Sequence, residues 1–184
     1  MRIIAGEFRS RVLKTLPGMA LRPTSDRLRE TLFNILGDVV RGAVFVDGYA
    51  GSGAVGLEAL SRGASQAIFL EQAKGPLRVL RQNIETLGLA GRALVFEGPA
   101  AKGLRKVSAG ANIIFLDPPY AAAEEYELAL GVLAGAGTGG LIVVEHASRL
   151  VLPVPPGLVL IRLKRQGDSA LSFFRCNAQL QSGY

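Results

Sequence analysis

Residues 113–120, IIFLDPPY, place one acid, two prolines and an aromatic ring directly behind four apolar residues that suit a buried strand. The carboxylate of Asp117 and a neighbouring backbone carbonyl can accept hydrogen bonds from an amino group and fix its nitrogen. Pro118 and Pro119 lack N–H groups and restrict the backbone, which keeps the Pro118 carbonyl in one orientation. Tyr120 offers a flat face on which a planar base can stack. The segment is therefore typical of a site that orients an exocyclic amine for reaction, without a strong general base.

A second group of residues surrounds the glycine-rich turn at 48–56, GYAGSGAVG. Gly51, Gly53 and Gly56 match the dinucleotide fingerprint, in which the strand leads almost directly into the first glycine and a pyrophosphate meets the helix N-terminus. Here Asp47 stands four residues before Gly51, at an expected strand end, where its charge would repel a pyrophosphate. An acid at this place suits a ligand with an ammonium or a sulfonium group, and S-adenosylmethionine carries both.

Glu71 ends the next expected strand, 24 residues after Asp47. An acid there can accept hydrogen bonds from ribose hydroxyls. Taken singly, each acid also has a purely structural explanation: Asp47 as the cap of the turn, and Glu71 as an exposed residue at a strand end. Both acids at consecutive strand ends favour a nucleoside ligand with cationic groups, and they predict S-adenosylmethionine as cofactor.

These side chains need a scaffold that brings strand ends together. Apolar runs of strand length alternate with helix-like segments, which favours a mostly parallel sheet with helices on both faces. In such a sheet, ligands lie beyond the carboxyl ends of the strands. Parallel strands are expected at 43–47, 66–71, 93–97, 112–117 and 141–145. Helices are expected after an N-cap at Thr24 or Ser25 and at 54–62, 74–87, 100–107 and 124–133.

The C-terminal part is expected to close the sheet in another way. Segments 158–164 and 170–176 flank the turn Gln166-Gly167-Asp168 and predict an antiparallel hairpin. Phe173 and Phe174 are adjacent, so only one of them is expected to face a core on one side of the sheet. Cys176 is expected to be a buried small hydrophobe, and His146 a surface or capping residue.

Length and composition limit the class of protein. The chain has 184 residues, enough for one domain with a sizeable core, and no apolar run is long enough to cross a membrane. A single Cys and a single His exclude an intramolecular disulfide and a Cys/His zinc site, and no metal site is expected. These features fit a cytoplasmic protein.

The charge is uneven along the chain. The net charge is +6, and residues 1–22 carry five basic residues against one acidic residue, Glu7. A basic arm or small hairpin at this end indicates a polyanionic partner, most simply nucleic acid. A solvated surface that merely favours Lys and Arg is the alternative. The residues expected to contact phosphates are Arg2, Arg9, Arg11 and Lys14.

The sequence DPPY behind a strand resembles the [NDS]-P-P-[YFW] motif of amino-group methyltransferases. Four more segments match in the same order over nearly the whole chain: RIIAGEFRSRVL, LRPTSDRLRETLFNIL, AGSGAVGLEALSRGA and KRQGDSALSFFR. Together they resemble the bacterial small-subunit ribosomal RNA guanine-N2 methyltransferases of the RsmD family. The resemblance implies a Rossmann-like α/β fold of the class I S-adenosylmethionine-dependent methyltransferases, with a mostly parallel seven-stranded sheet and an antiparallel C-terminal hairpin.

The resemblance also implies a substrate and a division of the chain. It implies N2 methylation of a guanine in 16S-type rRNA, in the 30S subunit or an assembly intermediate, by a monomer. Residues 1–22 are then a small N-terminal extension, and residues 23–184 the methyltransferase domain. The catalytic loop is Asp117, Pro118, Pro119 and Tyr120. The implied cofactor-binding residues are Arg22, Thr24, Asp47, Tyr49, Gly51, Gly53, Glu71, Gln72 and Ala100.

The sequence departs from the family pattern at two places. DGYAGSG stands where DLFAGSG is usual, and Pro99 stands where an Asp or Asn commonly meets the adenine amino group.

Two other functions use the same chemistry or fold. An adenine-N6 or cytosine-N4 DNA methyltransferase needs the same DPPY loop, although the chain is short for an added DNA-recognition domain. A non-catalytic RNA- or nucleotide-binding domain would not need Asp47, Glu71 and Asp117 together.

Overall fold

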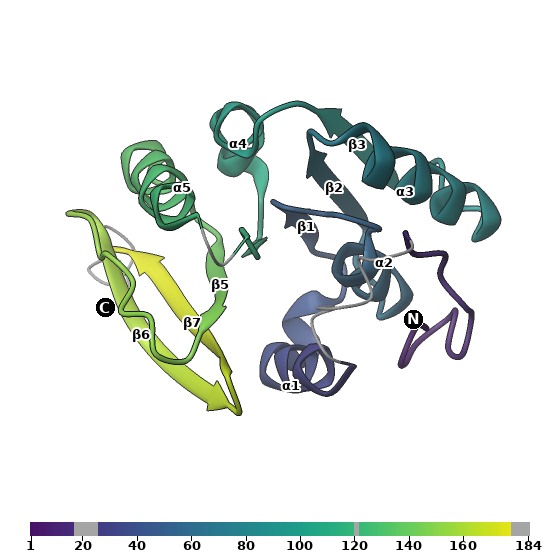
Figure 1. Cartoon of the computed structure of the whole chain (residues 1–184), viewed down its shortest axis with the longest axis horizontal. Helices are drawn as coiled ribbons and strands as arrows, with labels where there is room; N and C mark the ends of the chain where they lie inside the picture. Colours follow the sequence, from purple (N-terminus) through teal and green to yellow (C-terminus); the bar gives the residue numbers. More distant parts are fainter. Residues whose placement is uncertain (17–25, 120–121, 178–184) are drawn as a thin grey trace.

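The computed structural model describes residues 1–16, 26–119 and 122–177 (Figure 1). Arg22, Thr24 and Tyr120, three of the predicted site residues, lie outside these ranges, as does the predicted N-cap at Ser25.

A seven-stranded sheet in the order β3-β2-β1-β4-β5-β7-β6 forms the centre of the protein (Figure 1). Strands β1 to β5 pair in parallel, and β7 pairs antiparallel with both β5 and β6. This arrangement confirms the predicted class I methyltransferase fold. The strands are β1 (Val44–Asp47), β2 (Gln66–Glu71), β3 (Ala93–Glu97), β4 (Ile113–Leu116), β5 (Leu141–Ala147), β6 (Leu158–Gln166) and β7 (Ser169–Cys176).

Helices cover both faces of the sheet because successive strand residues point to opposite sides. Phe45 on β1 packs with α1, α2 and α3, whereas its neighbour Val46 packs with α4 and α5. The elements are α1 (Asp26–Leu36), α2 (Ala54–Ser61), α3 (Lys74–Thr86), α4 (Ala100–Val107), α5 (Ala123–Ala136), and the 3-10 turns η2 (Gly37–Val40) and η3 (Ser108–Gly110). In this arrangement, the segments that follow β1, β2, β3 and β4 meet beyond the carboxyl ends of the parallel strands.

The basic N-terminal segment is a hairpin that packs against the domain. Arg2 and Val12 form an antiparallel bridge, and Ile3 and Leu13 are buried in the core beside α1 and α2. The backbone N–H groups of Ile4 and Ala5 donate to the buried carboxylate of Glu58 on α2, at 2.7 and 3.0 Å. The hairpin is therefore fixed to the scaffold. The predicted boundary at 22–23 lies outside the described residues.

Of two expectations about β5 and β7, the one about His146 was wrong. Phe173 and Phe174 on β7 point to opposite sides of the sheet, as expected for adjacent strand residues, and both are buried because a core packs on each side. His146 is also buried and not a surface residue, with Nε2 2.8 Å from the Ser172 hydroxyl. Burial lowers the pKa of His146, which favours its neutral form. Cys176 is buried, as predicted.

Candidate active site

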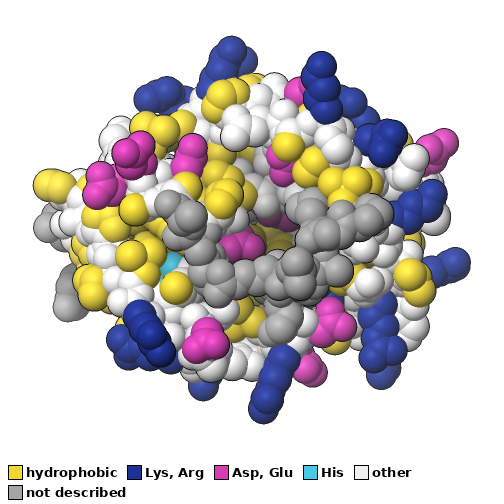
Figure 2. Space-filling model, viewed as in Figure 1, with side chains coloured by type: hydrophobic (Ala, Val, Ile, Leu, Met, Phe, Trp, Pro, Cys, Tyr) yellow, Lys and Arg dark blue, Asp and Glu magenta, His cyan; other side chains and the backbone are white. Residues whose placement is uncertain are grey.

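A pocket of about 920 Å³ lies beyond the carboxyl ends of β1, β2, β4 and β5. Acidic side chains are visible inside a hollow on the face that Figure 2 shows. Nine of the residues predicted to form the site line the pocket: Asp47, Tyr49, Gly51, Glu71, Gln72, Ala100, Asp117, Pro118 and Pro119. Asp47 and Asp117, which are 70 residues apart in the sequence, therefore meet at one place.

The glycine loop forms one wall of the pocket and depends on Gly53. Gly53 is the N-cap of α2 and has a φ of 85°, which L side chains rarely adopt. A Cβ atom at this position would lie 2.4 Å from Cδ1 of Leu80 on α3. Gly53 is absent from the pocket lining, so it shapes the loop by its backbone and its close contact with α3.

Asp47 lies at the end of β1 and is almost fully buried. Its Oδ2 accepts a hydrogen bond from the Gly56 N–H at 2.9 Å. The pKa of Asp47 is raised from 3.8 to about 7, chiefly by burial; the Gly56 N–H lowers it and the charge of Glu71 raises it, and the value is the balance of the three effects. A cation in the pocket would favour the ionised form of this acid.

Glu71, at the end of β2, holds two loops of the pocket wall together. One carboxylate oxygen accepts the Gly51 N–H at 2.8 Å, and the other accepts the N–H groups of Gln72 and Ala73 at 2.9 and 2.8 Å. The carboxylate thus connects the glycine loop to the start of α3. Sequence reasoning predicted a ribose contact for Glu71 but did not foresee these bonds.

Tyr49, one of the departures from the family pattern, spans the pocket to α5. Its hydroxyl donates to Oε2 of Glu125, in the first turn of α5, at 2.8 Å. Burial and the neighbouring Glu125 carboxylate raise the pKa of Tyr49, so the phenol stays protonated and remains a donor. This hydrogen bond connects the loop after β1 to the helix that follows the DPPY segment. Glu125 was not predicted as a site residue, although it follows that segment closely.

Asp117 directly follows β4 and is half-buried at the pocket wall. The next residue, Pro118, is buried, and its carbonyl accepts a hydrogen bond from the Tyr126 hydroxyl at 3.4 Å. Helix α5 therefore helps to fix the backbone orientation that the two prolines were expected to fix alone.

Glu145 is a pocket residue that sequence reasoning missed. It lies on β5, is only 4% exposed and lines the same pocket as Asp117. The sequence placed it at the end of an expected strand, which was the same signal that identified Asp47 and Glu71. No recognised motif surrounds Glu145 in the sequence, and its position at a strand end alone did not identify it as a site residue.

The charge of the pocket is one-sided. Among the described residues that line it, none is Lys or Arg, whereas six are acids: Asp26, Asp47, Glu71, Asp117, Glu125 and Glu145. The protein as a whole has a net charge of +6, so this concentration of negative charge is opposite to the overall composition. The pocket suits a cationic ligand and disfavours a pyrophosphate. Within the described ranges, no group of three His, Cys, Asp or Glu residues is arranged to hold a metal ion.

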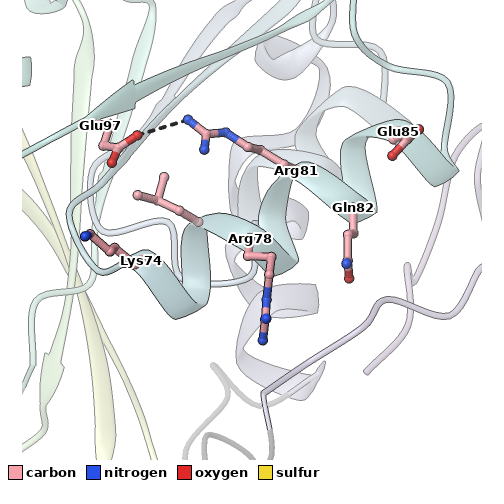
Figure 3. A pocket seen from close by; sticks show the side chains of 7 residues that line it. Lys74, Arg78, Arg81, Gln82, Glu85 and Glu97 are labelled. Atoms are coloured by element: carbon pink, nitrogen blue, oxygen red, sulfur yellow. Dashed lines mark hydrogen bonds and ion pairs between the residues drawn. The ribbon is translucent and has the colours of Figure 1, made fainter.

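A second, shallower groove of about 430 Å³ runs along the outer face of α3 (Figure 3). Lys74, Arg78 and Arg81 border it, and Arg81 donates to Glu97 at the end of β3 at 3.0 Å. Of the predicted cofactor and catalytic residues that the structure describes, none lines this groove. The four cations predicted to contact RNA are all exposed on the N-terminal hairpin, and the Lys14 N–H donates to Asn83 on α3 at 2.8 Å. The hairpin and α3 are therefore neighbouring basic elements.

Comparison with known proteins agrees with this geometry. The model of the family described as Conserved hypothetical protein 95 matches residues 1–175. The chain belongs to this family. The Conserved hypothetical protein 95 match includes the N-terminal hairpin, all the helices named above and nearly all of the sheet. In the part of the chain that the structure describes, no helix is long and apolar enough to span a membrane.

Relatives with assigned names resemble the chain over its full length. Ribosomal RNA small subunit methyltransferase D of Escherichia coli is 39% identical over 186 residues, which covers 99% of this chain and 93% of the relative. The solved structure of the Escherichia coli protein yhhF has a TM-score of 0.81 and 39% identity, covering 96% and 97% of the two chains. An RNA methyltransferase from Salinibacter ruber, solved with S-adenosyl-L-homocysteine, is 15% identical with a TM-score of 0.63 over 83% of this chain and 92% of its own, and shows the shared fold alone.

Proposed function

We propose that the protein transfers a methyl group from S-adenosylmethionine to the exocyclic N2 amine of a guanine in small-subunit ribosomal RNA. The observation that carries the proposal is the acidic pocket at the strand ends, which gathers Asp47, Glu71 and Asp117 without a lining Lys or Arg among the described residues. The full-length relative from Escherichia coli is named for methylation of small-subunit rRNA, which supports the same substrate.

The charges of the pocket fit S-adenosylmethionine, which supplies an electrophilic methyl group when it is bound. Its ammonium and sulfonium groups favour acidic surroundings, whereas the pyrophosphate of NAD would meet six carboxylates. Asp47 gains a partner for its charge, which burial otherwise disfavours. Tyr49, Gly51, Gln72 and Ala100 complete the predicted cofactor wall, and Arg22 and Thr24 remain predicted contacts.

Asp117 is the residue that acts on the amine. Its carboxylate accepts a hydrogen bond from the amino group and holds the nitrogen toward the donor methyl, and Pro118 and Pro119 keep the loop stiff. Tyr120 is the proposed stacking partner of the base. We assign the role of RNA contact to the exposed cations Arg2, Arg9, Arg11 and Lys14, and we propose a cytoplasmic monomer that acts on the 30S subunit or an assembly intermediate.

The test is methyl transfer with a tritiated donor and three substrates in parallel: 30S subunits that lack the modification, free 16S rRNA and duplex DNA. Digestion to nucleosides is expected to place the label in N2-methylguanosine from the rRNA substrates. Label in N6-methyladenine or N4-methylcytosine from DNA would establish the alternative enzyme. Tight binding of S-adenosylmethionine without transfer to any of the three would indicate a non-catalytic binding domain.

A further inference from the structure

The register of the sheet places a second carboxylate beside Asp117. Strands β4 and β5 are parallel neighbours, and Leu116 pairs with Val144. Asp117 and Glu145 are the next residues on the two chains, and adjacent strands lie about 4.8 Å apart. Two residues earlier, Phe115 and Val143 pack in the core on the side of α1 and α2, so Asp117 and Glu145 follow the same side. Both line the pocket.

The burial of Glu145 needs an explanation. Glu145 is only 4% exposed and pairs with Leu171 on β7, and the other β5 residues on the same side of the sheet, Leu141, Val143 and Ala147, are apolar. A buried carboxylate destabilises a fold relative to a well-packed apolar side chain, so buried acids beside a pocket are candidates for function. Val143, two residues earlier on the same side of β5, is apolar and buried, so the sequence changes from an apolar residue to an acid where the strand reaches the pocket.

The edges of the nucleobases differ at the atom next to the reactive amine. Guanine carries two neighbouring donors, N1–H and N2–H, whereas adenine N1 and cytosine N3 are acceptors beside their amines. Enzymes that act on single bases read these edges by hydrogen bonds. Two adjacent carboxylates complement the donor pair of guanine. The same carboxylates would place a negative charge against the lone pair of adenine N1 or cytosine N3.

We infer that Glu145 accepts the N1–H of the target guanine while Asp117 accepts its N2–H, and that this second contact selects guanine over adenine and cytosine. The inference rests on the proposed function, which it deepens by naming the residue that chooses the base. Asp117 orients an amine that all three bases possess. Glu145 contacts the neighbouring atom, at which guanine differs from the other two.

The first experiment compares Glu145→Gln and Glu145→Ala with the parent enzyme on unmodified 30S subunits. Loss of a hydrogen bond to a charged acceptor is expected to lower kcat/KM for guanine by about tenfold to a hundredfold, more in the Ala variant because Gln keeps an acceptor oxygen. Calorimetric affinity for S-adenosylmethionine is expected to stay within about twofold of the parent value. The matched control is Glu97→Gln, which changes an acid at the end of β3 outside the pocket and is expected to keep the parental rate.

The second experiment changes the base and compares the parent enzyme with Glu145→Gln and the control Glu97→Gln. In an RNA whose methylated guanine has been mapped, 2-aminopurine at that position keeps the amine but presents an acceptor at N1. The parent enzyme is expected to prefer guanine by tenfold or more. Glu145→Gln, whose amide can donate to that acceptor, is expected to reduce the preference, whereas Glu97→Gln is not.

The outcomes separate the two proposals. If the parent enzyme forms N2-methylguanosine but Glu145→Gln and Glu145→Ala both retain its rate, Glu145 does not contact the base and the proposed function stands. An equal rate of the parent enzyme on guanine and 2-aminopurine would overturn the role of Glu145 even if a variant failed to fold. If the parent enzyme forms no N2-methylguanosine in any RNA, both proposals fail.

Discussion

At the scale of single residues, the chemistry of the site depends on how its carboxylates are charged. Asp47 combines full burial with a neighbouring negative charge, and both raise its pKa, to about 7. Near neutral pH, a part of the unliganded molecules therefore holds a proton on this acid. A bound cationic ligand lowers the pKa of Asp47 again, because its positive charge stabilises the ionised carboxylate. Asp47 thus connects ligand binding to pH.

The first prediction concerns this coupling. Cations bind better to the ionised carboxylate. Affinity for S-adenosylmethionine is therefore expected to rise by up to about tenfold per pH unit between pH 5.5 and pH 7, and then to level off. The same raised pKa means that the folded protein holds the proton more tightly than the unfolded chain. The stabilising effect of Asp47 is therefore complete below about pH 3.8 and is lost as pH rises through 7.

Asp47→Asn tests both parts of this prediction. It is expected to remove the pH dependence of calorimetric affinity and to weaken binding at pH 8. It should also raise the free energy of unfolding at pH 8, by on the order of 1 kcal/mol, because it removes a buried charge. An affinity that shows the same pH profile in the parent protein and in the variant would assign the coupling to another group.

The second prediction concerns Asp117. The free amine of guanine is delocalised into the ring and is a poor nucleophile, so an acceptor that fixes its geometry contributes strongly to the rate. Removing one such contact costs on the order of 3 kcal/mol, and Asp117→Ala is expected to slow methyl transfer roughly a hundredfold or more. Asp117→Asn is expected to be milder because it keeps one oxygen. Binding of S-adenosylmethionine should survive in both variants, and a parental rate in Asp117→Ala would show that this acid is structural.

At the scale of elements, the glycine loop and α3 depend on each other. The loop after β1 can approach α3 closely only because Gly53 has no side chain, and the Glu71 carboxylate then connects the same loop to the start of α3. Asn83 on α3 also donates to the Ser52 carbonyl at 3.0 Å. A change in this contact should therefore reach the cofactor wall, although Gly53 itself does not line it.

The third prediction uses two glycines to separate strain from packing. Gly53→Ala introduces both an unfavourable φ and a Cβ 2.4 Å from Leu80, whereas Gly88→Ala, after α3, introduces only an unfavourable φ of 68° with no atom within 4 Å. Gly88→Ala is expected to lower the free energy of unfolding by about 1 kcal/mol. Gly53→Ala should lower it by about 2 to 4 kcal/mol and also weaken S-adenosylmethionine binding. Equal effects of the two substitutions on stability and affinity would show that the contact with Leu80 has no special role.

The elements also show what the sequence could and could not predict. The alternation of apolar runs with amphipathic segments identified the five parallel strands, and the Gly167 turn identified the two strands of the hairpin, because these signals are local. The environment of Phe173, Phe174 and His146 depends on which strands are neighbours. The antiparallel β7 lies inside the sheet, between β5 and β6, and this order is set by the tertiary topology. Glu125 was missed because it joins the site only through tertiary packing, in its bond to Tyr49. Glu145 carried the strand-end signal, but only the register of β4 and β5 places it beside Asp117.

At the scale of the whole molecule, opposite charges are separated in space. The pocket is lined by acids, while exposed cations lie on the N-terminal hairpin, along α3 and on β6. A small cationic ligand is attracted to the interior of the pocket, and a polyanion is attracted to the outside. An enzyme that brings S-adenosylmethionine to RNA needs both fields, and it must keep phosphates out of the donor site.

The last prediction identifies which exposed cations meet the RNA. The hairpin is held by buried bonds to Glu58 and Asn83 through its backbone, so its exposed side chains can be changed without undocking it. The combined variant Arg2→Ala, Arg9→Ala, Arg11→Ala and Lys14→Ala is expected to weaken binding to 16S rRNA. If each cation neutralises one phosphate, the slope of log affinity against log salt concentration should fall by up to about 3 for single-stranded RNA.

The control removes a comparable charge from the opposite edge of the sheet, where Arg162, Lys164 and Arg165 lie exposed on β6 (Figure 1). If the hairpin is the specific RNA contact, Arg162→Ala, Lys164→Ala and Arg165→Ala together should change the slope much less, because distant charges are screened beyond about 8 Å at physiological salt. Neither variant should alter calorimetric affinity for S-adenosylmethionine, since none of these cations lines the pocket. Equal slopes in the parent protein and the hairpin variant would mean that the hairpin is only a solvated surface, and a larger change in the β6 variant would transfer the RNA contact to the other edge.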